Sequence, residues 1–335
     1  MARGNVRTVA PPLALGLLAT GLAAAVVGSL LIGSGSLTPV QVWQGLSGAP
    51  GEAADILRTI RIPRTVFAVI IGAALGLAGA LTQGYTRNPL ADPGLLGITQ
   101  GAALAVVLAI TLLHLTSPVA YVWFAFGGAA LAAAMVFTIA GLGSGASPLS
   151  VVLVGAGISV SLSALTGAIA LSDRTSMDAL RFWGAGSVGG LAWPVLRVML
   201  PFLVIGFGLA ALCAPVLNAL DLGDDVAAAL GVHVFRGRLV GILTVTLLAG
   251  AATAACGSIA FLGLMVPHVA RSLTGPDFRW LLPCAAALGA VVLLAADIVG
   301  RVVARPGELQ AGIVVALLGA PFFLAVVLLR KAGTR

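Results

Sequence analysis

Long uncharged stretches, separated by short polar breaks, run through the whole chain. Residues 9–50 and 239–270 carry no formal charge, and residues 65–82 form an 18-residue uncharged run. Apolar runs of about 18 or more residues are typical of membrane-spanning helices, whereas the strands of a membrane barrel alternate apolar and polar residues. The pattern therefore predicts an all-α polytopic membrane protein.

The runs predict about ten transmembrane helices, with both termini on the same side of the membrane. Residues 239–270 would form a helix of about 48 Å, longer than a hydrocarbon core of about 30 Å. We therefore expect a break near Gly257 or Gly263, which divides them into one full span and a shorter helix. The other spans are expected at residues 9–33, 63–82, 94–113, 119–142, 149–171, 194–212, 281–299 and 310–329.

Polar segments interrupt these spans. Residues 83–93 contain two prolines and one charge of each sign, and residues 34–60 are expected to hold a short helix near residues 40–46. Residues 172–193 are interpreted as a long polar loop with Trp183 and Trp193, which suits the aromatic belt at a membrane surface.

Residues 217–238 are the most polar segment after the sixth span. Gly223 is expected to end one short helix, and Asp224 with Asp225 to begin another by capping exposed N–H groups. Gly231 would stop that second helix. The segment therefore predicts two short helices outside the bilayer.

A Gly-Ala-Ala sequence recurs at one offset of 178 residues. Residues 72–74 with Gly79 match residues 250–252 with Gly257, and both copies precede a polar break that contains proline. Five helices between the copies would make the repeat an inverted one, as in many transporters. The repeat-like halves would be residues 61–171 and 239–329 of one transmembrane domain, residues 1–335.

Composition supports the membrane interpretation. The chain is 60% hydrophobic and only 9% charged, against about 25% charged in soluble domains. Its net charge of +7 comes from arginines at the ends of apolar runs, which favours membrane-flanking charge over nucleic-acid binding. Cys213, Cys256 and Cys284 lie in or beside apolar runs without CxxC spacing, so we interpret them as small core residues.

Most enzyme motifs are missing from the sequence. The only lysine is Lys331 in the tail, so the chain has no phosphate-binding loop with its lysine. The histidines His114, His233 and His268 lie far apart, and there is no HExxH motif. We expect no cofactor on this chain, and any ATP that drives it must be hydrolysed by another chain.

Five motifs follow one another along the chain. They are RIPR at 61–64, NPLADPGLLG at 88–97, FLGLMVPH at 261–268 before Arg271, DIVGR at 297–301, and Glu308 with GI at 312–313 and GAPF at 319–322. Together they resemble the FecCD family over residues 55–330.

This resemblance implies a permease subunit of an ABC importer for ferric siderophores, haem or vitamin B12, in the bacterial cytoplasmic (inner) membrane. It implies ten helices per subunit, a second permease that is a copy or a paralogue, and an extracytoplasmic binding protein. It also implies two ATPase subunits, which would carry ATP and Mg²⁺.

The resemblance also assigns roles to the arginines near two helix ends. Arg61, Arg64 and Arg301 would expose their guanidiniums to acidic residues of the binding protein. Alternatively, they only flank helices at the lipid headgroups. Asp297 and Arg301 are spaced i,i+4, so they could pair with each other and make the arginine less available.

Further roles follow from the same resemblance. Residues 221–231 would be coupling helices seated in a groove of the ATPase, or else an ordinary solvated loop. Residues 83–93 and 143–150 would form a cytoplasmic gate, or else plain turns. The coupling residues would be Asp221, Gly223, Asp224, Asp225, Leu230 and Gly231; the gate residues Gln83, Asn88, Pro89, Ser147 and Ser150; and the structural residues Pro267, His268 and Asp297.

Two other functions stay open at this stage. An ion-coupled secondary transporter would need an ionisable residue in mid-span, and Asp297 is the only acid well inside an apolar stretch. An intramembrane enzyme would need a clustered catalytic set, and none is visible in the sequence. Among cargoes we expect a ferric siderophore first, followed by haem and cobalamin, since siderophores are the commonest cargo of the family.

Overall fold

The computed structural model describes residues 10–33, 35, 37–141, 148–190 and 193–332, and all regular structure in these ranges is helical. The elements are α1 (Pro11–Leu31), α2 (Pro39–Leu46), α3 (Glu52–Ile56), the π-helical turn η1 (Leu57–Arg61), α4 (Ile62–Thr86), the 3₁₀ turn η2 (Pro93–Leu96), α5 (Ile98–Leu113), α6 (Pro118–Gly141), α7 (Pro148–Ser172), α8 (Arg174–Gly184), α9 (Trp193–Asp221), α10 (Asp224–Ala229), α11 (Val234–Val245), the π-helical turn η3 (Thr246–Gly250), α12 (Ala251–Cys256), α13 (Leu262–Thr274), α14 (Phe278–Val303) and α15 (Ala311–Ala332).

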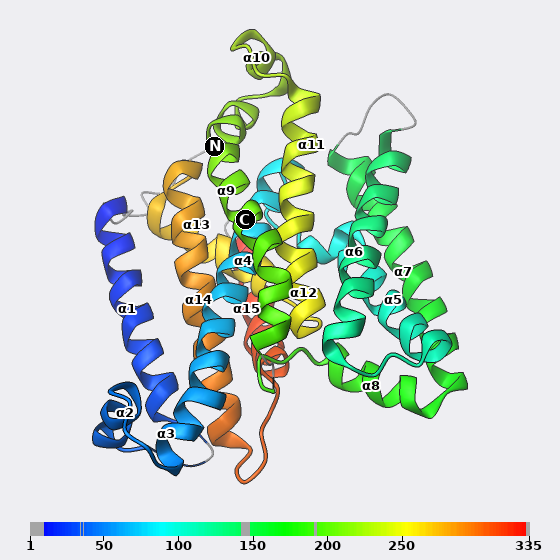
Figure 1. Ribbon diagram of the computed structural model, residues 1–335. Helices are drawn as coiled ribbons and strands as arrows, with labels where there is room; N and C mark the ends of the chain where they lie inside the picture. The colour runs from blue at the N-terminus through cyan, green and yellow to red at the C-terminus, as the bar shows by residue number, and fades with distance from the viewer. Residues whose placement is uncertain (1–9, 34, 36, 142–147, 191–192, 333–335) are drawn as a thin grey trace.

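The long helices form one bundle with two distinct ends (Figure 1). The short helix α10 projects at one end, and α2, α3 and α8 lie at the other. We call these the α10 end and the α2 end. Helix α1 lies on one flank of the bundle and helices α5 to α8 on the opposite flank, with α4 between them.

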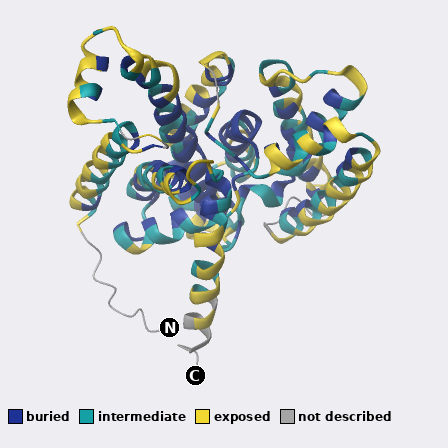
Figure 2. Ribbon diagram, turned by 90° about the horizontal axis from the view of Figure 1, so that it is seen from below, coloured by how far each residue is buried: buried dark blue, intermediate teal, exposed yellow. Residues whose placement is uncertain are grey.

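Helix α4 is the core of the bundle. In its most apolar window 78% of residues are buried, against 11% in α1 and 17% in α7. Three glycines of α4 allow this burial, because a Cβ on Gly72, Gly76 or Gly79 would overlap the backbone of α14 or α13. Small residues let membrane helices approach closely, and Figure 2 shows the resulting buried centre with exposed outer helices.

The helical prediction is confirmed. Among the residues that the structure describes, seven helices are long and apolar enough to cross a membrane, and the stretches Ile98–Leu113 of α5 and Ala311–Val326 of α15 are shorter apolar helices. Together with α13 they make about ten. The expected break in residues 239–270 lies between the end of α12 at Cys256 and the start of α13 at Leu262. Gly257 and Phe261 have positive φ there, which ends one helix before the next begins.

Three boundaries differ from the prediction. The polar break begins at Arg87 and not at Gln83, because α4 continues to Thr86. Helix α9 runs through Pro215 to Asp221, so the first of the two expected short helices is the end of α9. Neighbouring helices in a membrane protein can satisfy the backbone groups that a proline frees.

The polar segment after α7 is the third difference, since it contains the amphipathic helix α8. Asp173 caps this helix by accepting a hydrogen bond from the Ser176 N–H at 2.8 Å. Hydrogen bonds from the side chain and backbone of Ser176 hold the pKa of Asp173 below its usual range. Charged residues in this segment therefore mark a surface helix and not a loop.

The three cysteines are buried and form no disulfide. The inverted repeat, with its two copies offset by 178 residues, stays a prediction.

Candidate functional site

Two arginines share one buried carboxylate at the α2 end. Nη2 of Arg64 lies 2.7 Å from Oδ1 of Asp297, and Nη2 of Arg301 lies 2.9 Å from its Oδ2. Asp297 is fully buried, and Arg64 and Arg301 are 7% and 2% exposed. The predicted pairing of Asp297 with Arg301 is confirmed. Arg64 also donates from Nη1 to Glu308 at 2.6 Å, so it is held by two acids.

Helix α1 closes over this cluster. Arg301 donates to the carbonyl oxygens of Ser29 and Ile32, each at 3.0 Å, and to Ser29 Oγ at 2.8 Å. The same hydroxyl lies 2.8 Å from Oγ1 of Thr65 in α4. Buried polar groups must be hydrogen-bonded to avoid a large desolvation cost, and here α1, α4 and α14 satisfy one another.

Arg61 is bound differently from the other two arginines. It donates to the carbonyl oxygens of Leu30, at 2.6 Å, and Gly35. Within the described part of the chain it forms no ion pair. Its charge is therefore oriented by neutral groups and is not neutralised by a carboxylate.

A cavity of about 360 Å³ opens beside these side chains. Its charged lining residues are Arg61, Arg64, Arg301 and Glu308, so positive charge exceeds negative. The expectation that the three guanidiniums are exposed is wrong, because the end of α1 and the connection before α15 cover them. What remains accessible is the cavity, which would attract an anionic group.

The predicted coupling segment lies at the tip of the α10 end (Figure 1). Gly223 and Gly231 have φ of 113° and 84°, so both glycines permit a left-handed backbone on either side of α10. Asp221 and Asp225 are exposed. Three apolar side chains are exposed at a spacing of four residues: Leu222, Val226 and Leu230, at 64%, 45% and 64%. The segment thus presents an apolar stripe beside acidic side chains.

Asp224 has a different orientation from its neighbour Asp225. Its Oδ1 accepts a hydrogen bond from Arg87, and its Oδ2 accepts one from Arg238 at 2.8 Å. The carboxylate therefore joins three elements of this chain, and its position differs from that of the exposed acids around it.

The predicted gate residues lie in and beside the break between α4 and α5. Gln83 lies within α4 and donates to the Leu264 carbonyl of α13 at 3.1 Å. Asn88 accepts from the N–H of Leu90 at 3.0 Å, which fixes the turn that contains Pro89. Ser150 lies in the first turn of α7. Ser147 lies outside the described residues.

The first turns of α7 pack against this break. A Cβ on Gly155 would overlap the carbonyl of Leu95 in η2, so the two backbones lie in direct contact. This contact lies just beyond the two predicted gate segments, residues 83–93 and 143–150, so the gate stays a prediction.

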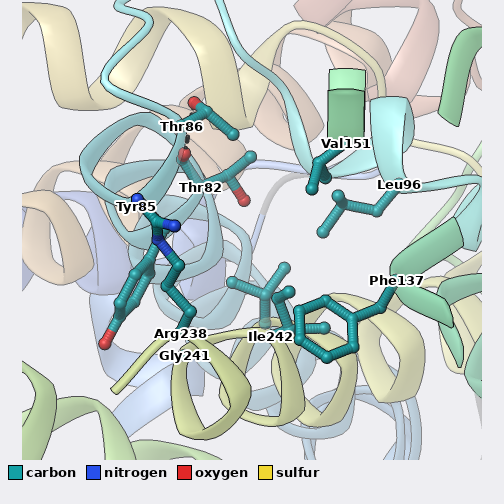
Figure 3. Close-up of a pocket in the computed structure, with 10 residues that line it drawn as sticks. Thr82, Tyr85, Thr86, Leu96, Phe137, Val151, Arg238, Gly241 and Ile242 are labelled. Carbon is teal, nitrogen blue, oxygen red and sulfur yellow. Dashed lines mark hydrogen bonds between the residues drawn. The ribbon is translucent and has the colours of Figure 1, made fainter. Parts of the chain in front are cut away.

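A small cavity of about 30 Å³ lies next to the break (Figure 3). Residues from α4, η2, α6, α7 and α11 surround it. Figure 3 shows Arg238 of α11 beside Tyr85 of α4. Helices α11 and α4 pack closely here, because a Cβ on Gly241 would overlap the Tyr85 ring.

The remaining predicted residues lie in α13. Pro267 is inside the helix, and the ring of His268 packs edge-on against Phe322 with 5.8 Å between centroids. Among the described residues, no group of three or more His, Cys, Asp or Glu side chains is arranged to hold a metal ion.

Sequence reasoning did not identify three residues of these sites. Glu308 belonged to one of the motifs but had no predicted role, and no role was predicted for Arg87 or Arg238. Their partners lie 244, 137 and 14 residues away in the chain, so spacing alone carries little signal.

Comparisons with known proteins agree with the motifs. The model of the FecCD transport family matches residues 21–330. The ferric enterobactin transport system permease protein FepD of Escherichia coli K12 is 44% identical over 98% of this chain and 97% of its own length. The hemin transport system permease protein HmuU of Yersinia pestis is 38% identical over 96% and 97%.

A solved structure, described as an inward-facing conformation of a metal-chelate type ABC transporter, also matches. It aligns with a TM-score of 0.84 at 29% identity and covers 94% of this chain and 99% of its own.

Proposed function

The chain belongs to the FecCD transport family, and from this premise we propose that it is the membrane-spanning permease subunit of an ABC importer for a metal chelate. It provides the pathway and makes no covalent chemistry. ATP and Mg²⁺ bind to a separate ATPase subunit, and no cofactor binds to this chain. The cargo reaches it on a binding protein outside the membrane.

The exposed apolar stripe of α10 is the observation that carries this proposal. Val226 lies on α10, the short helix that projects at this end, and the exposed side chains of Leu222 and Leu230 lie just before and just after it. Exposed apolar patches bordered by polar residues mark protein interfaces. Asp221 and Asp225 border the stripe and would steer a basic groove onto it. We assign this surface to the ATPase.

This assignment sets the orientation of the protein. The α10 end faces the cytoplasm, and the α2 end faces outward from the bacterial cytoplasmic (inner) membrane. The break after α4 and the start of α7 then lie at the inner end of the pathway, where Gln83, Asn88, Pro89 and Ser150, with Ser147, form the cytoplasmic gate.

The arginine cavity at the α2 end is the docking site for the binding protein. Arg61 supports this role because its charge is held by carbonyl oxygens alone. A carboxylate that enters the cavity would gain a charge-assisted hydrogen bond. Arg64 and Arg301 also line the cavity and add positive potential to it, although both are already paired with Asp297.

A second permease subunit packs against α7. One face of this helix exposes Gly157, Ser161, Ala164 and Ala168, at the spacing of successive turns. Small residues on an exposed membrane helix allow close approach of another helix. The partner is a copy of this chain or a paralogue.

The cargo is a ferric siderophore. FepD is named for ferric enterobactin and HmuU for hemin, and the identity to FepD is higher. Haem is therefore the next candidate, followed by cobalamin.

An ion-coupled secondary transporter is the alternative, with Asp297 as its ion-binding residue. The contacts of Asp297 disfavour it, because Arg64 and Arg301 already surround the carboxylate and leave little affinity for a proton or a sodium ion.

The test is co-purification of an ATPase with this chain, using wild type and Leu230→Glu. We expect the wild type to bring down the ATPase and Leu230→Glu to lose it. Leu46→Glu is the matched control, since Leu46 is similarly exposed, at 55%, on a short helix at the α2 end. Uptake that follows a proton or sodium gradient without any ATPase would contradict the proposal.

The docking assignment has a separate test. Arg61→Gln should weaken binding of the substrate-loaded binding protein to the complex in liposomes by about tenfold, as for the loss of one charge-assisted hydrogen bond. Arg174→Gln, an exposed arginine of α8 at the same end, should leave the affinity unchanged. Equal losses of affinity in the two variants would show that Arg61 contributes only through the overall positive charge of this end and not through a specific contact.

A further inference from the structure

Arg87 stands where α4 ends and the polar break begins. Its φ of 49° is left-handed, so the chain turns out of the helix at this residue. Asn88 and Pro89 follow directly. We call residues 87–93, the part of the predicted gate at residues 83–93 that follows α4, the gate segment. Arg87 joins the end of α4 to the gate segment, so a displacement of its side chain acts directly on that junction.

Asp224 is the first residue of α10, and it receives the Arg87 guanidinium. Nη2 of Arg87 donates to Asp224 Oδ1 and to the Leu220 carbonyl at the end of α9. A single guanidinium thus holds both sides of the turn at Gly223. The end of α9 and the start of α10 are both attached to the gate segment by one side chain.

Arg238 completes the arrangement from α11. It donates to Asp224 Oδ2 at 2.8 Å, and its side chain also lines the small cavity beside Tyr85 (Figure 3). The side chains of Arg87, Asp224 and Arg238 are 36%, 39% and 18% exposed. Ion pairs at such exposure contribute little to folding stability, so their effect here is on position.

Few other contacts hold α10. Its main packing partners are its chain neighbours α9 and α11. In the described ranges, the pair of Arg87 and Asp224 is the ion pair that joins the coupling segment to the gate segment.

We propose that Asp224 is a positioning residue, which transmits displacement of the ATPase-bound α10 to the gate segment through Arg87, with Arg238 holding the carboxylate in place. This inference rests on the proposed function. It separates the two adjacent acids: Asp225 faces the ATPase, whereas Asp224 faces the chain's own gate.

Loss of the pair should uncouple hydrolysis from transport without detaching the ATPase. The apolar stripe that binds the ATPase is intact in Asp224→Asn and Arg87→Gln, so both variants should still bring it down. The amount of chelate transported per ATP hydrolysed should fall at least about fivefold, the factor that corresponds to the lower end of typical coupling free energies. The double variant should be no worse than either single one, since each already breaks the same link.

The experiment compares wild type, Asp224→Asn, Arg87→Gln and the double variant in proteoliposomes with the ATPase and the loaded binding protein. It measures co-purified ATPase, ATP hydrolysis and chelate uptake. Asp178→Asn is the control, because it removes another exposed Arg–Asp pair, that of Asp178 with Arg181 at 3.5 Å, at the α2 end.

Distinct results overturn distinct claims. Normal uptake per ATP in both single variants, or additive losses in the double variant, would refute the link. Loss of the ATPase from Asp224→Asn would make Asp224 an ATPase contact and also refute it. Failure of the wild type to bring down any ATPase would instead remove the proposed function on which the inference rests.

Discussion

The carboxylate of Asp297, near the end of α14, accepts hydrogen bonds from Nε and Nη2 of Arg64, at the start of α4. The two residues are 233 positions apart in the chain. Arg301 holds the other side of the same carboxylate, and α1 covers the group. One buried acid therefore links α4 to α14, and Arg301 extends the link to α1, although these helices lie far apart in the sequence.

Asp297→Asn should destabilise the protein strongly. The change leaves two buried guanidiniums without their shared carboxylate, and breaking a buried pair in this way costs about 3–5 kcal/mol. The apparent melting temperature in detergent should fall clearly. Asp178→Asn breaks an exposed pair worth about 0–1 kcal/mol and should leave that temperature almost unchanged. Equal stability of the two variants would mean that the buried pair is replaceable by neutral hydrogen bonds.

Glu308→Gln should strengthen docking of the binding protein. Glu308 is partly exposed, at 41% of its side chain, and occupies Nη1 of Arg64 at 2.6 Å. A carboxylate arriving from outside must compete with it for the same guanidinium. Removing its charge should raise the affinity about three- to tenfold at low salt, and screening should erase the gain at high salt.

The control for this prediction is Glu52→Gln, which removes an acid from α3 at the same end. Weaker binding by Glu308→Gln would show that the acid orients Arg64 for docking and does not compete with the partner.

Gly79→Ala should impair folding, although alanine is the better helix former. A Cβ at this position would overlap the backbone of Gly263 in α13, and backbone cannot move aside as a side chain can. Overpacking of this kind costs about 1–3 kcal/mol or more. Gly208→Ala in α9, with no atom within 4 Å of the new Cβ, should be neutral or up to about 1 kcal/mol more stable. Thermal unfolding and the expression level of the two variants, each compared with wild type, measure these effects.

Asp277 should make part of the stability depend on pH. A hydrogen bond from the Arg279 N–H and another from the Asn218 side chain hold its pKa below the usual range. The ionised form is therefore favoured in the folded state. Its contribution is complete above the unfolded pKa of about 3.9 and is lost as pH falls through the lower folded value.

Asp277→Ala tests this dependence. Loss of the cap of α14 should cost about 0.5–2 kcal/mol at pH 7, and the difference from wild type should shrink below about pH 4. Asp277→Asn should keep most of the stability at pH 7, because an amide oxygen still caps the helix, and should lose the pH dependence. A difference between Asp277→Ala and wild type that stays constant down to pH 3 would refute the role.

Helix positions and the local pair of Asp297 with Arg301 were predictable because both follow from spacing along one helix. The partners of Arg64 were not, since its pairing depends on which helices become neighbours. The burial of Arg61 was missed for the same reason: its cover comes from the end of α1. The polar segment around α10 was predicted from its glycines and acids, but one carboxylate of the pair at 224–225 turns inward only because Arg87 and Arg238 lie there.

The separation of Arg64 from Asp297 has a consequence for biogenesis. At about 5–20 residues per second, the ribosome needs about 12–47 s to synthesise the intervening chain. During that time α4 stands in the membrane with an arginine near its end that lacks its carboxylate and reaches toward the headgroups instead. The arrival of α14 supplies the carboxylate. A chain truncated before residue 297 therefore keeps an unpaired charge at a helix end, which gives membrane quality control a chemical means of distinguishing unfinished from finished subunits.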